Sequence, residues 1–342
     1  MATAQDVALT IGKEAAYGTP VTVSRSLPVL GNGSLNFRPK REDSAAFRYG
    51  ARLQSSAGRV MVTSDVGGEE KFELGTRDFG LLWNACFGAV TSTLVPASAP
   101  AVYQQNHTIG DPLPSLTVQK LLPSLNADAT FSDSVFTFDG VMVKSWTLDV
   151  PNRGIATLAL TLDGRNVTMA TPKVAPVYAA ANHLLHFGGA CLHTGTITAP
   201  TATAVASAAT PVANVKSITI SGDNALSDDP YLFCGNGKKS RKPQRGRMKV
   251  SGTLAVEYRT DGPFVAAFLN DTSMTMLLNL AALENADEQE QVILTEVKIE
   301  GDLPQAGGDP GVIELKVPFT AYQNAAGDSP ITVVNRTYDT AV

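Results

Sequence analysis

The chain has 342 residues, of which 44% are hydrophobic and 17% are charged, and its formal net charge is -5 at pH 7. The length gives room for about two domains, and the hydrophobic share excludes a disordered chain. The negative charge disfavours extensive nucleic-acid binding, because a protein that binds phosphates needs a basic excess on its contact face. The low charge density leaves wide surfaces that contacts between subunits could cover.

The cysteines Cys86, Cys191 and Cys234 are an odd, widely spaced set without a CxxC pair. This pattern predicts no disulfide framework and favours a reducing compartment. The N-terminal region lacks the basic stretch and apolar core of a secretory signal, and no apolar run approaches the roughly 18 residues of a membrane span. We therefore expect no association with a membrane.

Short alternating runs of apolar and polar residues, separated by turn residues, predict antiparallel β structure. Leu158, Leu160 and Leu162 alternate with Ala159 and Thr161, as expected of a strand with one buried face. The sequence therefore predicts a mainly β protein with few, short helices.

One short helix is predicted from Asp78 to about Gly88. Asp78 is a suitable N-cap, and Phe79, Trp83 and Phe87 recur on one helical face. The helix should therefore pack one apolar face on a sheet.

The segment that contains this helix has a counterpart in the second half of the chain. VGGEEKFELGTRDFGLLW (66–83) aligns with VSGTLAVEYRTDGPFVAAF (250–268) after one insertion, and Gly68 matches Gly252. In the second copy, Pro263 would occupy the first helical turn, where proline is tolerated. Both copies predict a strand, a turn and a short helix.

A second pair of similar blocks follows in the same order. Residues 143–162 resemble residues 294–319, with Leu148 matched to Ile299 and a longer turn in the second copy. The shared order favours a tandem duplication, and chance similarity between two β-rich segments is the alternative. The predicted organisation is an N-terminal arm (1–26), a first β domain (27–193), an uncharged Thr/Ala/Pro linker (194–214) and a second β domain (215–342).

The densest cluster of potential metal ligands is His183, His186, Cys191 and His193, but its spacing matches no standard zinc motif. No GxSxG elbow, cysteine-nucleophile motif or phosphate-binding loop accompanies it. We expect no metal, no cofactor and no catalysis.

Residues 238–249, in the second half of the chain, form a basic loop that contains several lysines and arginines and no acidic residue. Contact with DNA phosphates, pairing with a neighbouring subunit and a solvated loop all remain open. The acidic stretch at 284–291 favours subunit pairing, because charge complementarity fixes the register between surfaces. A mixed-charge segment at 38–59 holds the equivalent place in the first half. The predicted contact residues between subunits are Arg38, Lys40, Arg41, Arg48, Lys238, Lys239, Arg241, Lys242, Arg245, Arg247, Glu284, Asp287, Glu288 and Glu290.

Residues 11–22 read IGKEAAYGTPVT, which resembles the opening of many tail tube proteins of long, flexible-tailed bacteriophages. Later blocks are also similar to this family: the strand carrying Gly68 and Glu73, DGVMVKSWTL at 139–148 and ISGDNAL at 220–226. The resemblance implies β-sandwich or half-barrel tube domains with a short flanking helix. In this family the sheets of neighbouring subunits join around a central channel.

The resemblance implies a structural virion protein that assembles into stacked rings of the tail tube, the conduit for DNA ejection. Rings in this family are usually sixfold, so a duplicated chain predicts a trimer, with a hexamer as the alternative. The implied partners are tape-measure, tail terminator and distal tail proteins, while genomic DNA passes through the lumen without specific binding. The implied location is the virion tail, assembled in the host bacterial cytoplasm. The alternative class is a monomeric β-sandwich binding or decoration protein of the virion, which the 7% aromatic content disfavours.

Overall fold

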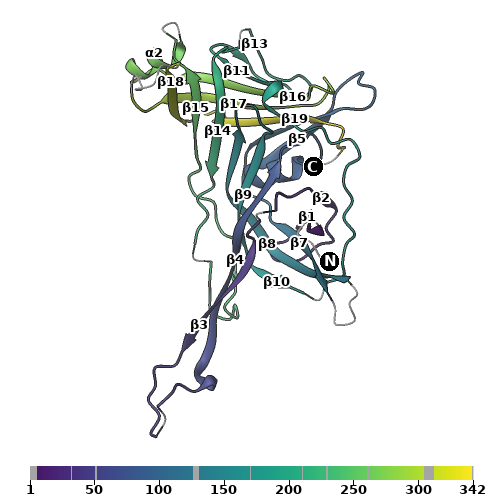
Figure 1. Cartoon of the computed structure of the whole chain (residues 1–342), viewed down its shortest axis with the longest axis vertical. Helices are drawn as coiled ribbons and strands as arrows, with labels where there is room; N and C mark the ends of the chain where they lie inside the picture. The colour runs from purple at the N-terminus through teal and green to yellow at the C-terminus, as the bar shows by residue number, and fades with distance from the viewer. Residues whose placement is uncertain are drawn as a thin grey trace.

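The structure is a computed structural model that describes residues 6–31, 33–50, 52–125, 131–169, 171–209, 211–228, 230–259, 262–303, 312–340 and 342. Within these ranges 17 strands join into one large antiparallel sheet, two further strands form a separate hairpin, and there are two short α-helices (Figure 1). The prediction of a mainly β protein is confirmed.

The first half of the chain begins in the sheet. Leu9 and Ile11 on the first strand are core residues, so the described part of the predicted N-terminal arm (1–26) includes a buried strand of the sheet. The elements are β1 (Ala8–Lys13), β2 (Arg25–Leu27), β3 (Asn36–Asp43), β4 (Arg59–Glu73), α1 (Gly80–Phe87), β5 (Gly88–Leu94), β6 (Tyr103–Ile109), β7 (Leu116–Leu125), β8 (Phe131–Val150), β9 (Thr157–Gly164) and β10 (Asn166–Thr168).

The second half contributes the remaining strands and helix. Its elements are β11 (Ala190–Thr194), β12 (Ile197–Thr198), β13 (Ser207–Ala208), β14 (Val215–Asp223), β15 (Lys249–Glu257), α2 (Pro263–Leu269), β16 (Met274–Ala281), β17 (Gln289–Ile299), β18 (Glu314–Ala321) and β19 (Ile331–Thr337).

Eight strands from the two halves pair in one continuous antiparallel series, β3–β4–β9–β8–β14–β15–β18–β17. The first four strands belong to the first half and the last four to the second. Within each half the strands follow in the same spatial order. The joint between β8 and β14 therefore connects two similar four-stranded units.

The two units also share their register. Gly68 on β4 lies opposite Leu162 on β9, and Gly252 on β15 lies opposite Phe319 on β18. Gly68 and Gly252 are the residues that the sequence comparison matched. Strands aligned from sequence alone are thus paired with equivalent partners in both halves.

A second pair of hairpins repeats an irregularity. The register between β7 and β8 shifts between Leu116 and Val118, and the register between β16 and β17 shifts between Met274 and Met276. Such bulges are fixed features of a sheet rather than random defects. The two halves therefore carry the same bulge at the same place.

One residue match from the sequence is wrong. Ile299 lies opposite Phe319, as Val143 lies opposite Leu162, so the counterpart of Ile299 is Val143 and not Leu148. The first half also carries an extra residue in a bulge after Val143.

Both predicted helices exist, but α1 differs in detail. It begins at Gly80, and Asp78 does not cap it; Asp78 has φ of 67° and pairs with Arg25 at 2.8 Å. All residues of α1 are buried, so the helix lies inside the core instead of presenting one face to it. Helix α2 has Pro263 in its first turn, as predicted.

An aromatic cluster around α1 holds the core together. The Trp83 ring stacks on Phe87 with centroids 5.9 Å apart and meets Trp146 of β8 edge-on at 5.7 Å. The surrounding buried residues form one cluster that draws on both halves. The two units thus share a core as well as a sheet.

The described part of the predicted linker (194–214) forms the β12–β13 hairpin, which packs on the sheet. Gln104 donates to the Thr201 carbonyl at 2.8 Å, Arg336 to the Thr203 carbonyl at 2.7 Å and Gln291 to the Ala206 carbonyl at 3.0 Å. This segment is therefore anchored on the sheet.

Candidate assembly surface

Strands β3 and β4 form a hairpin that extends well away from the body of the molecule (Figure 1). We call residues 36–65 the arm. Four of the predicted contact residues lie exposed on it: Arg38, Lys40, Arg41 and Arg48. The arm therefore presents positive charge to its surroundings.

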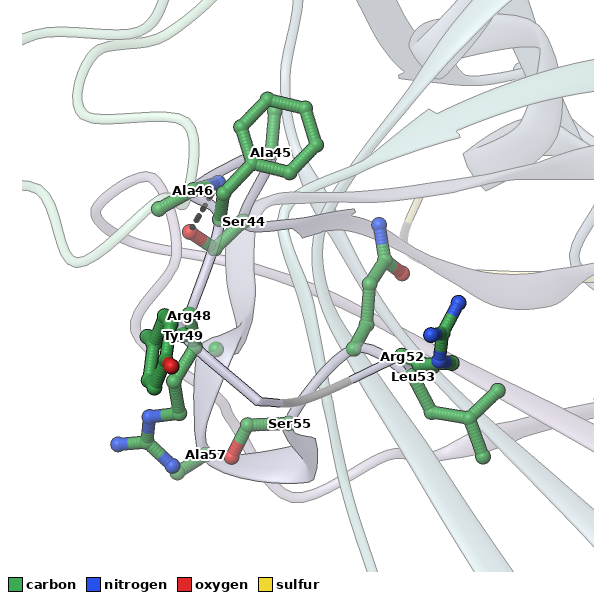
Figure 2. Close-up of a pocket in the computed structure, with 12 residues that line it drawn as sticks. Ser44, Ala45, Ala46, Arg48, Tyr49, Arg52, Leu53, Ser55 and Ala57 are labelled. Carbon is green, nitrogen blue, oxygen red and sulfur yellow. Dashed lines mark hydrogen bonds between the residues drawn. The ribbon is translucent and has the colours of Figure 1, made fainter.

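The tip of the arm, residues 44–58, exposes large apolar side chains. Phe47 and Tyr49 are about as exposed as in an extended chain (105% and 106%), and Leu53 is 89% exposed. The tip encloses an open hollow of about 950 Å³, lined only by its own residues. Figure 2 shows Arg48 and Tyr49 on one side of this loop and Arg52 and Leu53 on the other. Contiguous exposed apolar groups usually mark an interaction site.

The basic loop returns to the base of the arm, where one of its residues is buried. Lys239 is 4% exposed and forms ion pairs with Asp163 and with Asp65, the latter at 2.7 Å. The Ser64 amide also donates to the Gly237 carbonyl at 2.8 Å. The prediction of Lys239 as a contact between subunits is wrong, because its charge is neutralised within the chain.

Arg245, also predicted as a contact between subunits, is instead bonded within the chain. Its guanidinium donates to the carbonyls of Phe87 (3.2 Å) and Gly110 (3.0 Å), and its side chain is almost fully covered. It fixes the C-terminal end of α1. The other predicted residues of the loop, Lys238, Arg241, Lys242 and Arg247, reach the surface at least in part.

The acidic stretch is also split between surface and core. Glu288 is buried and approaches Arg77 (3.9 Å) and His183 (2.6 Å). Glu290 is buried and accepts a hydrogen bond from the Trp83 indole at 2.9 Å. The prediction of these two glutamates as contacts is wrong, whereas Glu284 and Asp287 are exposed.

The histidines and Cys191 of the candidate metal cluster do not converge on one site. His183 bonds to Glu288, the His186 ring accepts from the Gly188 amide at 3.1 Å, and Cys191 is exposed. Among the described residues, no group of three or more His, Cys, Asp or Glu side chains could hold a metal ion. No helix in the described ranges is long and apolar enough to cross a membrane.

The eight-stranded series has a second face, which we call the polar face, and the sequence analysis did not identify it. Its residues alternate with the buried ones, and they are mainly small or charged, with hydrogen bonds between Thr147 and Ser221 (3.1 Å) and from Thr219 to Asp149 (2.7 Å). The alternation was the available signal, but only the pairing shows that the polar positions of different strands share one surface. On the six inner strands the polar face comprises Asp65, Gly67, Glu69, Lys71, Glu73, Ser145, Thr147, Asp149, Thr157, Ala159, Thr161, Asp163, Ser217, Thr219, Ser221, Asp223, Lys249, Ser251, Thr253, Ala255, Glu257, Glu314, Lys316, Pro318 and Thr320. It continues on the outer strands through Asn36 and Arg38 of β3 and Lys298 of β17.

A continuous sheet with a polar face and an exposed arm fits a subunit of a polymer. The family model described as phage tail tube protein matches residues 4–321. The chain belongs to the phage tail tube protein family. The match includes both four-stranded units, the arm and the basic loop. No curated protein matches the sequence.

Membership makes this protein a structural component of a phage tail and confirms the family that the sequence motifs indicated. Proteins of the tail tube family are structural.

Proposed function

We propose that this protein assembles into stacked rings that form the tail tube, through which genomic DNA passes during ejection. The supporting observation is the eight-stranded sheet, which buries one face in the core and presents a polar face that the basic loop covers at Asp65 and Asp163. A curved sheet of this kind, continued from copy to copy, encloses a channel. Closure would also remove the open strand edges that otherwise invite aberrant pairing.

The polar face is the proposed wall of the channel. Its small hydroxyl side chains leave a smooth surface, and its acidic residues outnumber its basic ones. Phosphates gain salt-sensitive affinity from each contact with lysine or arginine, so a mildly acidic wall disfavours adhesion of DNA. DNA would therefore slide along this face without specific binding.

Three chains per ring is the proposed stoichiometry, with six as the alternative. The support is the repeated strand order, register and bulge, which favour a tandem duplication of one tube domain. If each unit occupies one position of a sixfold ring, three copies complete it. Each interface would be heterologous, so that a ring closes while stacking stays open-ended.

The arm is the proposed contact between stacked rings. Its exposed tip carries Phe47, Tyr49 and Leu53, and its basic residues Lys40, Arg41 and Arg48 would face the exposed acids Glu284 and Asp287 of another copy. Electrostatic complementarity would fix the register, and burial of the apolar tip would supply affinity. The tape-measure, tail terminator and distal tail proteins are proposed partners at the lumen and ends, with assembly in the host cytoplasm.

Electron microscopy of the purified chain tests this function. We expect rings or tubes, and averaged cross-sections should show a central channel with three chains, each contributing two similar units. Monodisperse small particles at all concentrations would contradict assembly and favour the decoration protein. Six complete chains per ring would contradict the trimer alone.

A further inference from the structure

The joint between β8 and β14 shows how two four-stranded units connect within one chain. Gly222 of β14 lies opposite Trp146 of β8. A Cβ added at Gly222 would collide with the Trp146 indole, so the aromatic ring crosses the joint and covers the glycine. The joint therefore combines strand pairing with an aromatic–glycine contact.

The same register identifies the corresponding positions at the two free ends of the series. Strand β3 is the counterpart of β14, because each pairs with the matched strand that carries Gly68 or Gly252. At the other end, the Glu300 amide donates to the Pro318 carbonyl at 2.8 Å, so Glu300 lies opposite Pro318. In the first half, Ser145 lies opposite Thr161, the counterpart of Pro318. Glu300 is thus the counterpart of Ser145.

Strand β3 presents an open edge. The Ser34 amide donates to the Glu69 carbonyl at 2.7 Å, and hydrogen-bonded pairs alternate along an antiparallel ladder. The amide and carbonyl of Phe37 therefore point away from β4, and no strand of the described part of the chain pairs there. The neighbouring Leu35 amide bonds to the Glu70 carboxylate at 3.2 Å. The Phe37 amide bonds only to the exposed side chain of the preceding Asn36 at 2.8 Å, a local contact that the carbonyl of a partner strand would replace.

The segment after β17 offers the complementary edge. The Glu300 amide points to β18, so in an extended continuation of β17 the next residue, Gly301, would direct its amide and carbonyl to the opposite side. Gly301 has φ of 108°, and the chain leaves the extended conformation there. Glycine adopts extended and left-handed conformations at similar cost, so a partner strand could straighten this segment.

We propose that Phe37 of one copy pairs with Gly301 of the next copy in the ring, in the register of the β8–β14 joint. This inference rests on the proposed function and assigns the strands that close the ring. We call this contact the seam. A Cβ added at Gly301 would meet the Pro318 ring at 2.8 Å, so the seam shares the register of the joint but not its aromatic–glycine contact.

The side chains beside the seam are complementary. The register places the exposed Arg38 opposite the exposed Glu300, so opposite charges meet on the polar face. On the other face it places Leu35 opposite Leu303, which is 47% exposed. Pairing would stop at Pro39, which has no amide hydrogen to donate.

The seam cannot form within one chain. Strands β3 and β17 are the first and last of the eight-stranded series, which puts them about 34 Å apart along the sheet at about 4.8 Å per strand. A covalent link between these edges would therefore report a contact between copies.

Disulfide cross-linking tests the seam. With Cys191→Ser and Cys234→Ser removing the exposed thiols, Arg38→Cys and Glu300→Cys are introduced into one chain. Directly opposite residues lie about 4.5 to 5.5 Å apart at Cα, within disulfide range. Oxidation of assembled tubes should convert most of the protein into a closed covalent ring, which runs as a trimer on a non-reducing gel.

An out-of-register pair is the control. Asn36→Cys with Glu300→Cys places the thiols on diagonal positions about 7 to 8 Å apart, so little cross-linking is expected. Tubes that form normally but cross-link at the control pair, or at neither pair, overturn the seam and leave the tube function standing. Failure of the unmodified chain to form rings overturns both.

A charge exchange gives an independent readout. Arg38→Glu should raise the protein concentration needed for assembly several-fold, because the introduced carboxylate would face the carboxylate of Glu300 in the next copy. Combining it with Glu300→Arg should restore assembly to near the original concentration. Equal defects in the single and double variants would overturn the pairing of these two residues.

Discussion

The indole nitrogen of Trp83 donates a hydrogen bond of 2.9 Å to Oε2 of Glu290, deep in the core. Trp83 belongs to α1 of the first unit and Glu290 to β17 of the second. Burial raises the pKa of Glu290 to about 8, although the indole hydrogen bond lowers it. The two units are therefore joined through a carboxyl group that is protonated at neutral pH.

The raised pKa of Glu290 predicts that the free energy of unfolding falls as the pH rises. An unfolded glutamate has a pKa of about 4.3, so between about pH 4.5 and 8 the folded protein holds a proton that the unfolded chain has released. This difference lowers the free energy of unfolding by about 1.4 kcal/mol per pH unit. Above about pH 6.5, where a buried histidine no longer contributes an opposing slope, Glu290→Gln should abolish that slope in urea unfolding of the unassembled chain, whereas the exposed Glu284→Gln should keep it. A slope that persists in Glu290→Gln would contradict the assignment.

The lowered pKa of His107 predicts that the free energy of unfolding rises with pH under acidic conditions. It is fully buried, and burial lowers its pKa to about 3, whereas an unfolded histidine has a pKa of about 6.5. Between these values the unfolded chain binds a proton that the folded protein does not, so stability rises with pH. His107→Gln should flatten the dependence of the free energy of unfolding on pH between about 3 and 4.5, below the range in which Glu290 contributes, and the half-buried His186→Gln serves as its control. Equal acid sensitivity in both variants would rule out His107 as the cause.

Replacing the buried Lys239 is expected to destabilise the base of the arm. Lys239→Met leaves Asp163 and Asp65 without their shared cation. Removing one partner of a buried ion pair is strongly destabilising, but Asp65 is nearly half exposed, so we expect about 1 to 3 kcal/mol. Lys238→Met, at the neighbouring and more exposed position, should change unfolding by less than about 0.5 kcal/mol. The comparison fails if the two variants unfold at the same urea concentration.

Substitutions at the arm tip are expected to impair the stacking of rings without changing the stability of the fold. Phe47→Ser, Tyr49→Ser and Leu53→Ser together remove apolar groups that have little contact with the rest of the chain, so Tm should stay within about 2 °C. Stacking of rings should be lost, because the apolar area that it buries is gone. Val177→Ser, also at an exposed apolar residue, should assemble normally. Tubes of normal length from the triple variant would remove the arm from the contact between rings.

Local sequence was sufficient wherever neighbours in the chain determine the structure. Alternation at Leu158, Leu160 and Leu162 predicted a half-buried strand, and Pro263 marked the first turn of α2. Gly68 and Gly252 identified strands that the structure pairs in the same register. The motif at 11–22 indicated the family.

Tertiary structure decided which charges are exposed. Lys239, Arg245, Glu288 and Glu290 lie in charge-rich runs that predict solvated surface, yet each is buried against a partner distant in sequence. A charge pattern records which residues are polar but not which distant groups desolvate and pair with them. The polar face depends on long-range pairing in the same way, because alternation gives each strand two faces and only neighbouring strands determine which polar positions share one surface. The sequence by itself thus determined the β class, the matched strands and the family, whereas the joint at Trp146 and Gly222 and the open edge at Phe37 followed only from the pairing of strands far apart in the chain.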